Sequence, residues 1–315
     1  MRKKPLLWLA VGTASTIAAT AAVVAFRRDK RATITALRGS SRVHHTPHGA
    51  VEYATHGEGE PLQFVNGGMG GYEQGLSVQR MLGLTDHRLI SPSRPGYRQT
   101  NTGGSLVEQA AAMHALLDHL GIEQTNVLAL SAGGLAALQF ATDYPDRCQR
   151  LILLSAHGPE LVYSQPSRFW LVLLDAMLGS DFLVWVLMRF GMGPLMRLMG
   201  VRSANYHTSI ANLKDFLRGV FPSTDWREGT LNDVRQLLAG HAPAVEQIRV
   251  PTLILHGTRD VIVPPVVALD TAQRIQGAQH VEVAGGTHMM MATHAAEIER
   301  LIRSFYHVRR LDPPG

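Results

Sequence analysis

The stretch NVLALSAGGLAALQFATDYP, residues 126–145, decides the fold of this chain. An apolar run ends at Leu130, Ser131 follows, and a segment with the apolar spacing of a helix begins directly afterwards. Ser131 therefore lies at a predicted corner between a strand and a helix. The residues two before and two after such a corner approach each other, so both must be small. Ala129 and Gly133 meet this requirement, and the pattern makes Ser131 a candidate nucleophile.

Six further short apolar runs predict the other strands around this corner. They are VEYATH (51–56), PLQFVN (61–66), RLISPS (88–93), RLILLSA (150–156), PTLILHG (251–257) and HVEVAGG (280–286). Runs of this length, bounded by Gly and Pro and separated by helical segments, are typical of a parallel sheet. Ser105 and Glu108 form a capping-box pattern that predicts one of the intervening helices. The sequence thus predicts an α/β fold with a mostly parallel sheet and helices on both faces.

The alternation of strand and helix patterns stops between residues 159 and 245. Short hydrophobic stretches there are interrupted by Gly, Asp and Arg, so none of them is long enough to cross a membrane. We expect this segment to form a helical lid inserted between two strands. The core is then assigned to residues 50–158 and 246–309.

The N-terminal segment predicts a membrane anchor. Residues 5–26 carry no charged side chain, and Lys and Arg residues flank them on both sides. A helix of this length spans about 33 Å, enough to cross the hydrocarbon core of a bilayer. We therefore expect residues 1–31 to form a single-pass transmembrane anchor with basic flanks and residues 32–49 to form a tether. The lipid bilayer is the expected partner of residues 5–26.

Two properties of this segment stay open. A cleaved signal peptide is the alternative to an anchor, because Ala19-Thr20-Ala21 matches the small-residue pattern of a cleavage site. The side of the membrane that holds the body is also undetermined. The basic residues after the segment favour a cytoplasmic body, whereas the short basic N-terminus also suits the opposite orientation.

The charge distribution argues against a nucleic-acid partner. The net charge is +5, but residues 1–42 hold nine of the 30 basic residues and one of the 25 acidic residues. The body is slightly acidic, which is not the pattern of a nucleic-acid groove. The single Cys148 excludes an internal disulfide, and His44, His45 and His48 have no carboxylate or cysteine at ligand spacing. We therefore expect neither a metal nor a cofactor.

Two further side chains complete the set that a serine nucleophile needs. Asp260 follows the run 251–257 and His288 follows the run 280–286, so each lies just beyond the carboxyl end of a predicted strand. Parallel strands bring these ends to one edge of the sheet, where open α/β sheets bind ligands. A serine hydroxyl needs a base within hydrogen-bond reach and an acid that orients this base. We expect Ser131, His288 and Asp260 to form a catalytic triad.

A glycine-rich segment, VNGGMGGYEQG (65–75), follows the strand run 61–66. Backbone N–H groups in such a turn are suited to stabilise a developing negative charge. Together with the corner serine and the chain order Ser, Asp, His, this segment makes residues 51–306 resemble the α/β-hydrolase fold superfamily, specifically its lidded bacterial serine hydrolases.

This resemblance implies roles for further residues. Asn66-Gly67-Gly68 occupies the position of the His-Gly-x motif, which implies that the N–H groups of Gly68 and Ala132 form the oxyanion hole. Asn66 departs from the usual histidine. The loop SPSRPGYRQT (91–100) also resembles the family, with structural roles for its Arg and Tyr.

A serine nucleophile indicates acyl transfer to water rather than the chemistry of fold members that use a carboxylate nucleophile. We expect a membrane-tethered serine hydrolase that cleaves carboxylic esters of apolar acyl groups through an acyl-enzyme. Thioesterase, aminopeptidase, carbon–carbon bond hydrolase and perhydrolase activities use the same triad and stay open as alternatives. A non-catalytic binding module on the same fold is a further alternative.

Apolar side chains near the predicted site favour an apolar substrate. The lid stretch 169–201 holds several large aromatic side chains and five methionines, and a methionine follows His288 directly. Methionine and aromatic side chains form adaptable apolar surfaces. The candidate substrate contacts are Met69, Trp170, Trp185 and Met289.

Overall fold

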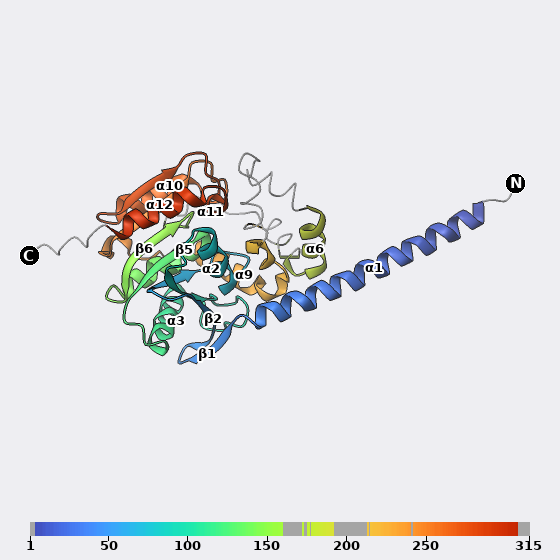
Figure 1. Cartoon of the computed structure of the whole chain (residues 1–315), viewed down its shortest axis with the longest axis horizontal. Helices are drawn as coiled ribbons and strands as arrows, with labels where there is room; N and C mark the ends of the chain where they lie inside the picture. Colours follow the sequence, from blue (N-terminus) through green and yellow to red (C-terminus); the bar gives the residue numbers. More distant parts are fainter. Residues whose placement is uncertain are drawn as a thin grey trace, which may run out of the picture.

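A computed structural model gives the fold of the chain (Figure 1). It describes residues 4–159, 172, 175–176, 178–191, 213, 215–240 and 242–307. The side chains of residues 4–15 and 18 are outside this description. Part of the predicted lid, including Trp170, also lies outside the described residues.

An eight-stranded sheet lies at the centre of the described chain. Its strands are β1 (Arg42–Thr46), β2 (Gly49–His56), β3 (Glu60–Val65), β4 (His87–Pro92), β5 (Thr125–Leu130), β6 (Cys148–Leu154), β7 (Thr252–Gly257) and β8 (Gln279–Val283). They lie in the order β1-β2-β4-β3-β5-β6-β7-β8. Strand β2 pairs antiparallel with β1 and β4, and every other pair in this sheet is parallel. The predicted α/β fold with a mostly parallel sheet is confirmed.

Helices cover both faces of the sheet. One face carries α3 (Leu106–His119), α4 (Gly134–Asp143) and α10 (Pro265–Arg274). The other face carries α2 (Tyr72–Met81), α11 (Met290–Thr293) and α12 (Ala295–Tyr306). Helix α3 begins with the predicted capping box, because Ser105 and Glu108 each accept a hydrogen bond from the backbone N–H of the other.

The central strands contribute to two cores, one on each face of the sheet. In β5, Val127 and Ala129 belong to the core under α3 and α4, whereas Leu128 and Leu130 belong to the core under α2 and α12. Successive side chains of a strand point to opposite faces, so a strand buried on both faces is apolar throughout. This explains the unbroken apolar run that precedes Ser131.

The described part of the predicted lid consists of short elements between β6 and β7. They are α6 (Asp181–Val186), the π-helical turn η2 (Leu187–Gly191), η4 (Ser223–Asp225) and α9 (Arg227–Leu238); η5 (Val245–Gln247) precedes β7. The buried Asp181 joins two of these elements. Its carboxylate accepts hydrogen bonds from Ser223 Oγ at 3.1 Å and from the N–H of Thr224 at 3.0 Å.

Helix α1 (Lys4–Arg38) extends away from the body, and its later turns lie beside α6 (Figure 1). The Phe26 ring makes edge contacts with three aromatic rings of the lid segment, those of Phe182, Trp185 and Phe221. Four residues further along the helix, Lys30 forms an ion pair with the buried Asp181. One end of α1 is therefore attached to the lid.

The predicted tether, residues 32–49, contains regular structure instead of a solvated linker. Helix α1 continues to Arg38, and β1 begins at Arg42 and pairs with β2. The physical reason is that Arg, Lys, Ala and Leu after the apolar segment are good helix formers, so charge alone does not end the helix. Among the described residues, no helix combines the length and the apolar character needed to span a membrane. The side chains of residues 5–15, half of the predicted anchor, lie outside that part of the chain.

Candidate active site

Ser131 directly follows β5 and begins η1 (Ser131–Gly133), which leads into α4. Its φ of 51° lies in the left-handed region, which costs a non-glycine residue about 1–3 kcal/mol. The chain around it is packed so closely that two glycines are required. A Cβ on Gly133 would lie 2.5 Å from the carbonyl oxygen of Val65, and one on Gly134 would lie 2.2 Å from that of His157. These contacts hold the corner in its strained conformation.

The three side chains predicted to act together meet at the carboxyl edge of the sheet. His288 Nε2 lies 2.9 Å from Ser131 Oγ, and His288 Nδ1 lies 2.9 Å from Asp260 Oδ2. An ionised carboxylate only accepts hydrogen bonds, so Nδ1 carries the proton and Nε2 is free to accept the serine hydroxyl. The sheet explains the meeting, because Gly257 of β7 pairs with Val283 of β8 and the loops that carry the acid and the base start side by side.

The carboxylate of Asp260 is buried and fully engaged. Its Oδ1 accepts the N–H groups of Ile262 and Val263 at 2.9 Å each, and His256 Nε2 lies 3.3 Å from Oδ2. Burial raises the pKa of this carboxyl group, but the hydrogen bonds from His256, His288 and the backbone hold the pKa well below its ordinary value. Asp260 therefore stays ionised around neutral pH, where its charge orients the imidazole.

The glycine-rich loop after β3 lies against the nucleophile. Val65 of β3 pairs with Ala129 of β5, so the segments that follow these two strands leave the sheet side by side. A Cβ on Gly67 would lie 3.2 Å from the Cβ of Ser131. The loop therefore brings its backbone to the place where the acyl oxygen of a substrate attacked by Ser131 would lie.

Hydrogen bonds engage both backbone polar groups of Gly67 in this loop. The N–H of Gly67 donates to Gln74 Oε1 at 2.8 Å, and its carbonyl accepts from Asn66 Nδ2 at 2.9 Å. In a trans peptide the N–H of Gly68 points opposite to that carbonyl. The N–H of Ala132 lies in the first turn of a helix, where N–H groups lack a partner within the helix. Gly68 and Ala132, the residues predicted for the oxyanion hole, thus directly follow Gly67 and Ser131 in the chain, and their N–H groups remain the candidates for this role.

Asn66, which stands where the family usually has a histidine, holds the glycine-rich loop through its side-chain amide. Its Nδ2 donates to the carbonyl of Gly70 at 2.7 Å as well as to that of Gly67, and its Oδ1 accepts the N–H of Arg94 at 3.0 Å. Arg94 Nε in turn donates to the carbonyl of Asn66 at 2.7 Å. An amide side chain, which both donates and accepts, satisfies the loop without a histidine.

Arg94 also joins this loop to the lid. Its guanidinium makes a two-pronged ion pair with Asp233 of α9, with N–O distances of 2.5 and 2.8 Å, and both side chains are buried. Tyr97 donates a further hydrogen bond to the same carboxylate. Burial lowers the pKa of Arg94, but the Asp233 charge more than offsets this and holds the pKa above its ordinary value. The structural roles expected for Arg94 and Tyr97 agree with these contacts.

The four candidate substrate contacts lie in different environments. Met69 follows the oxyanion loop and is 41% exposed, so it stays beside the site. Met289 is buried in the core under α12, and Trp185 donates to Asp29 at 3.1 Å and faces α1. Met289 therefore packs in the core, and Trp185 packs against Phe26 of α1. Trp170 lies outside the described residues.

His157 is a site residue that the sequence patterns did not single out. It follows β6, which lies between β5 and β7, so it enters the edge between the nucleophile and the acid. Its N–H donates to the carbonyl of Ser131 at 3.0 Å. Burial, together with the charge of the nearby His288, lowers the pKa of His157 to about 4. Its place directly after the strand run 150–156 is the signal that identifies it.

Among the described residues, no three His, Cys, Asp or Glu side chains gather to hold a metal ion.

Comparisons with known proteins identify related families and one relative that covers most of the chain. The model of the alpha/beta hydrolase fold family matches residues 60–184, and that of the TAP-like protein family matches residues 230–312. The uncharacterized hydrolase YcgS of Bacillus subtilis is 28% identical over 275 residues, which cover 82% of this chain and 95% of the relative.

Two solved structures share the fold. An alpha/beta hydrolase fold protein from Nakamurella multipartita superposes with a TM-score of 0.68 at 24% identity, covering 84% of this chain and 98% of that one. A membrane phospholipase A, described as a bacterial virulence factor, superposes with a TM-score of 0.61 at 18% identity and covers 96% of this chain and 95% of its own. From the strand order, the corner serine and these matches, the chain belongs to the alpha/beta hydrolase fold superfamily.

Proposed function

We propose that this chain is a membrane-tethered serine hydrolase that cleaves carboxylic esters of apolar acyl groups. The family match and the hydrolase among its relatives support hydrolase activity. The observation that carries the mechanism is the pair of 2.9 Å contacts that links Ser131 through His288 to Asp260.

The acylation step follows from these contacts. Ser131 Oγ attacks the carbonyl carbon of the ester while its proton passes to His288 Nε2. The carbonyl oxygen becomes an oxyanion that accepts the N–H groups of Gly68 and Ala132. The tetrahedral adduct then breaks its bond to the alcohol oxygen, which takes the proton from Nε2 and leaves as the free alcohol. Asp260 stabilises the transient imidazolium through Nδ1.

The deacylation step repeats the same proton transfers with water. His288 Nε2 takes a proton from a water molecule, and the hydroxide attacks the acyl-enzyme carbonyl. The same two N–H groups accept the second oxyanion. Collapse of this adduct breaks the bond to Ser131 Oγ, which regains its proton from His288, and the carboxylic acid leaves.

Exposed apolar side chains support the proposed tether and the apolar substrate. The lid elements α6 and η2 expose Phe182, Leu183, Leu187 and Phe190, and α1 exposes Ile17 and Val24. An exposed apolar patch of this kind is typical of a membrane or ligand contact. The Phe26 contacts place α6 beside α1, so both apolar surfaces lie on the same side of the body. The described likeness to a membrane phospholipase A covers nearly the whole chain, α1 included, and fits the same proposal.

Replacing the nucleophile tests the mechanism. We expect Ser131→Ala to abolish covalent labelling by a fluorophosphonate and to lower kcat for p-nitrophenyl butyrate by about 10³-fold or more, because the acyl-enzyme cannot form. Labelling followed by peptide mapping identifies the modified serine. The buried Ser155 also follows a strand and has a positive φ, so Ser155→Ala is the matched control and should label normally. Full turnover by Ser131→Ala would reject the triad.

The ionised state of Asp260 predicts a pH-dependent stability. Its pKa is lower in the folded chain than in the unfolded one, so the stabilisation is complete above the unfolded value of about 3.9 and is lost as the pH falls below it. The melting temperature of the wild type should therefore fall more steeply between about pH 5 and pH 3 than that of Asp260→Asn. The exposed Asp143→Asn should retain the wild-type slope. Parallel curves for wild type and Asp260→Asn would contradict the assignment.

A series of acyl chain lengths tests the substrate class. Each buried methylene contributes about 0.8 kcal/mol, so kcat/KM should rise by up to about fourfold per carbon from acetyl to octanoyl p-nitrophenyl esters before it levels off. Measurements below the micellar limit of each ester separate pocket binding from aggregation. Equal or falling efficiency beyond acetyl would reject an apolar acyl pocket. Preference for thioesters, peptides or carbon–carbon substrates over esters would instead favour the corresponding alternative activity.

Charged substitutions on the exposed face of α1 test the tether. The full chain should stay in the membrane pellet after an alkaline carbonate wash. Ile17 and Val24 are 69% and 61% exposed, so replacing both by Lys leaves the described packing intact. Ile17 lies near the middle of the uncharged stretch 5–26, where a lysine costs about 2.5–3.5 kcal/mol, and Val24 lies near its end, where the cost is smaller. The double variant should therefore move toward the soluble fraction. Recovery of soluble wild-type protein whose N-terminus is Ala22 would show signal cleavage instead.

A further inference from the structure

The described chain contains a cavity of ≈ 720 Å³ that is separate from the triad. It lies between the last turns of α1, helix α2 and the lid, and none of Ser131, Asp260 and His288 lines it. Its volume is within the range of small-molecule sites, about 300–1,000 Å³. Neither the hydrolytic mechanism nor the fold requires a hollow at this place.

One part of the cavity wall is apolar. Ala32 and Ala36 lie one turn apart on the same face of α1, and Leu76 of α2 faces them across the cavity. Trp185 and Phe221 of the lid complete this part. The lining as a whole exposes more apolar than polar surface, which suits a hydrocarbon chain.

The rest of the wall carries guanidinium groups in excess over free carboxylates. Arg80 and Arg218 share one carboxylate, that of Asp215, and the side chain of Arg218 is 79% exposed. Arg189 of η2 has no ion pair among the described residues. The two other lining carboxylates also have partners. Glu73 pairs with Arg98, and Asp29 pairs with Arg28 and accepts a hydrogen bond from Trp185. The lining itself holds three guanidinium groups and three carboxylates, and Arg28 and Arg98 pair with two of these carboxylates from outside it. The charge of Arg189 also acts on Asp29. Together with the two outer arginines, the cavity has an excess of positive charge that an anionic head group can neutralise.

The position of the cavity on α1 matches the surface of a bilayer. Asp29 is the first lining residue and lies three positions after Phe26, where the uncharged stretch ends. Three residues of helix correspond to about 4.5 Å. If the anchor spans the hydrocarbon core as proposed above, the cavity opens at the level of the lipid head groups.

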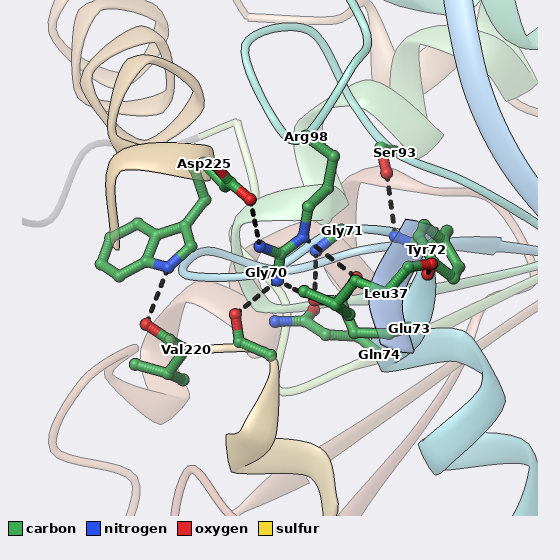
Figure 2. A network of polar contacts seen from close by, with 12 residues as sticks. Leu37, Gly70, Gly71, Tyr72, Glu73, Gln74, Ser93, Arg98, Val220 and Asp225 are labelled. Carbon is green, nitrogen blue, oxygen red and sulfur yellow. Dashed lines mark hydrogen bonds and ion pairs between the residues drawn. The ribbon is translucent and has the colours of Figure 1, made fainter. Parts of the chain in front are cut away.

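The polar floor of the cavity reaches the oxyanion loop. Glu73 accepts the N–H of Gly71 at 2.8 Å and a hydrogen bond from Arg98 at 2.6 Å, as Figure 2 shows. The same view shows Leu37 of α1, whose carbonyl oxygen accepts a hydrogen bond from the hydroxyl of Tyr72, the first residue of α2. Anchor helix, cavity and oxyanion loop are thus connected by direct hydrogen bonds.

We propose that this cavity binds one anionic lipid from the bilayer surface. The acyl chain lies on the apolar wall formed by Ala32, Ala36 and Leu76, and the head-group phosphate lies among Arg80, Arg189 and Arg218. The inference rests on the proposed membrane tether but not on the catalytic proposal.

Binding of short-chain lipids to the full chain in neutral detergent tests this site. The probes are dihexanoylphosphatidylglycerol, its phosphatidylcholine counterpart and inorganic phosphate, with affinities measured by isothermal titration. We expect the anionic lipid to bind about tenfold or more tightly than the zwitterionic one, because charge-assisted contacts to phosphate are lost or offset by the choline. The double variant Arg189→Glu, Arg218→Glu should weaken this binding by at least about tenfold.

Two further variants separate the cavity from general charge and fold effects. Arg300→Glu on α12 makes the same kind of charge change at an exposed position outside the cavity and should bind the anionic lipid like the wild type. Ala36→Trp fills the apolar wall and should abolish binding while the melting temperature stays unchanged.

Equal affinity for the two lipids, or unchanged binding by both the charge and the filling variants, would overturn the proposal. Displacement of the lipid by an equal concentration of inorganic phosphate would assign the site to free phosphate and overturn it as well. Fluorophosphonate labelling of the same samples reports on Ser131 independently. Lipid binding without labelling would therefore reject the hydrolase mechanism and leave the cavity assignment standing.

Discussion

The close approach of two backbones at Gly133 is the constraint on which the rest of the site depends. A side chain there would collide with the carbonyl oxygens of Val65 and Asn66, so the turn after β5 and the turn after β3 can touch only through glycine. This contact keeps Ser131 at a φ of 51° and sets the oxyanion loop beside its hydroxyl. The corner that carries the nucleophile is therefore fixed against the loop after β3 by backbone contact, and the side chains of Asn66 and Gln74 hold the shape of that loop.

The loop and the lid share a buried charge pair, and this ties their positions together. Arg94 holds two carbonyl groups of the loop and, with the same guanidinium, the carboxylate of Asp233 on α9. Removing one partner of a buried pair leaves an uncompensated charge, which costs about 3–5 kcal/mol. A lid movement that separated α9 from Arg94 would carry this cost and would release the loop at the same time. Helix α9 thus supports the loop after β3 through Arg94.

The sequence predicted the features that depend on local pattern and missed those that depend on packing. Strand runs, the corner serine, and the acid and base after later strands follow from chain order, because a parallel sheet brings all carboxyl ends to one edge. His157 obeys the same rule because it follows β6, but it belongs to no recognisable sequence motif. Trp185 and Met289 could not be placed in this way, since apolar residues pack equally well in a core, against another helix or around a substrate. Nothing in the composition of the predicted tether stops helix α1 before Arg38, so the first residues of that segment continue the helix.

Helix α1 connects the predicted anchor to the body through polar contacts that are partly buried. Lys30 pairs with Asp181, whose carboxylate also organises the turn at Thr224 in the lid, and the hydroxyl of Tyr72 holds the end of the helix at Leu37. Burial raises the pKa of Asp181, but these hydrogen bonds hold the pKa below its ordinary value, so the carboxylate stays charged. Separating Asp181 from its partners would leave its carboxylate buried without a compensating charge, which is costly, so the partners stay together. These contacts therefore fix α6 and the turn at Thr224 relative to α1. Arg98, which pairs with Asp225 of that turn and with Glu73, continues the connection to the loop after β3. If α1 is held in a bilayer, the plane of that bilayer sets which face of the lid meets the lipid.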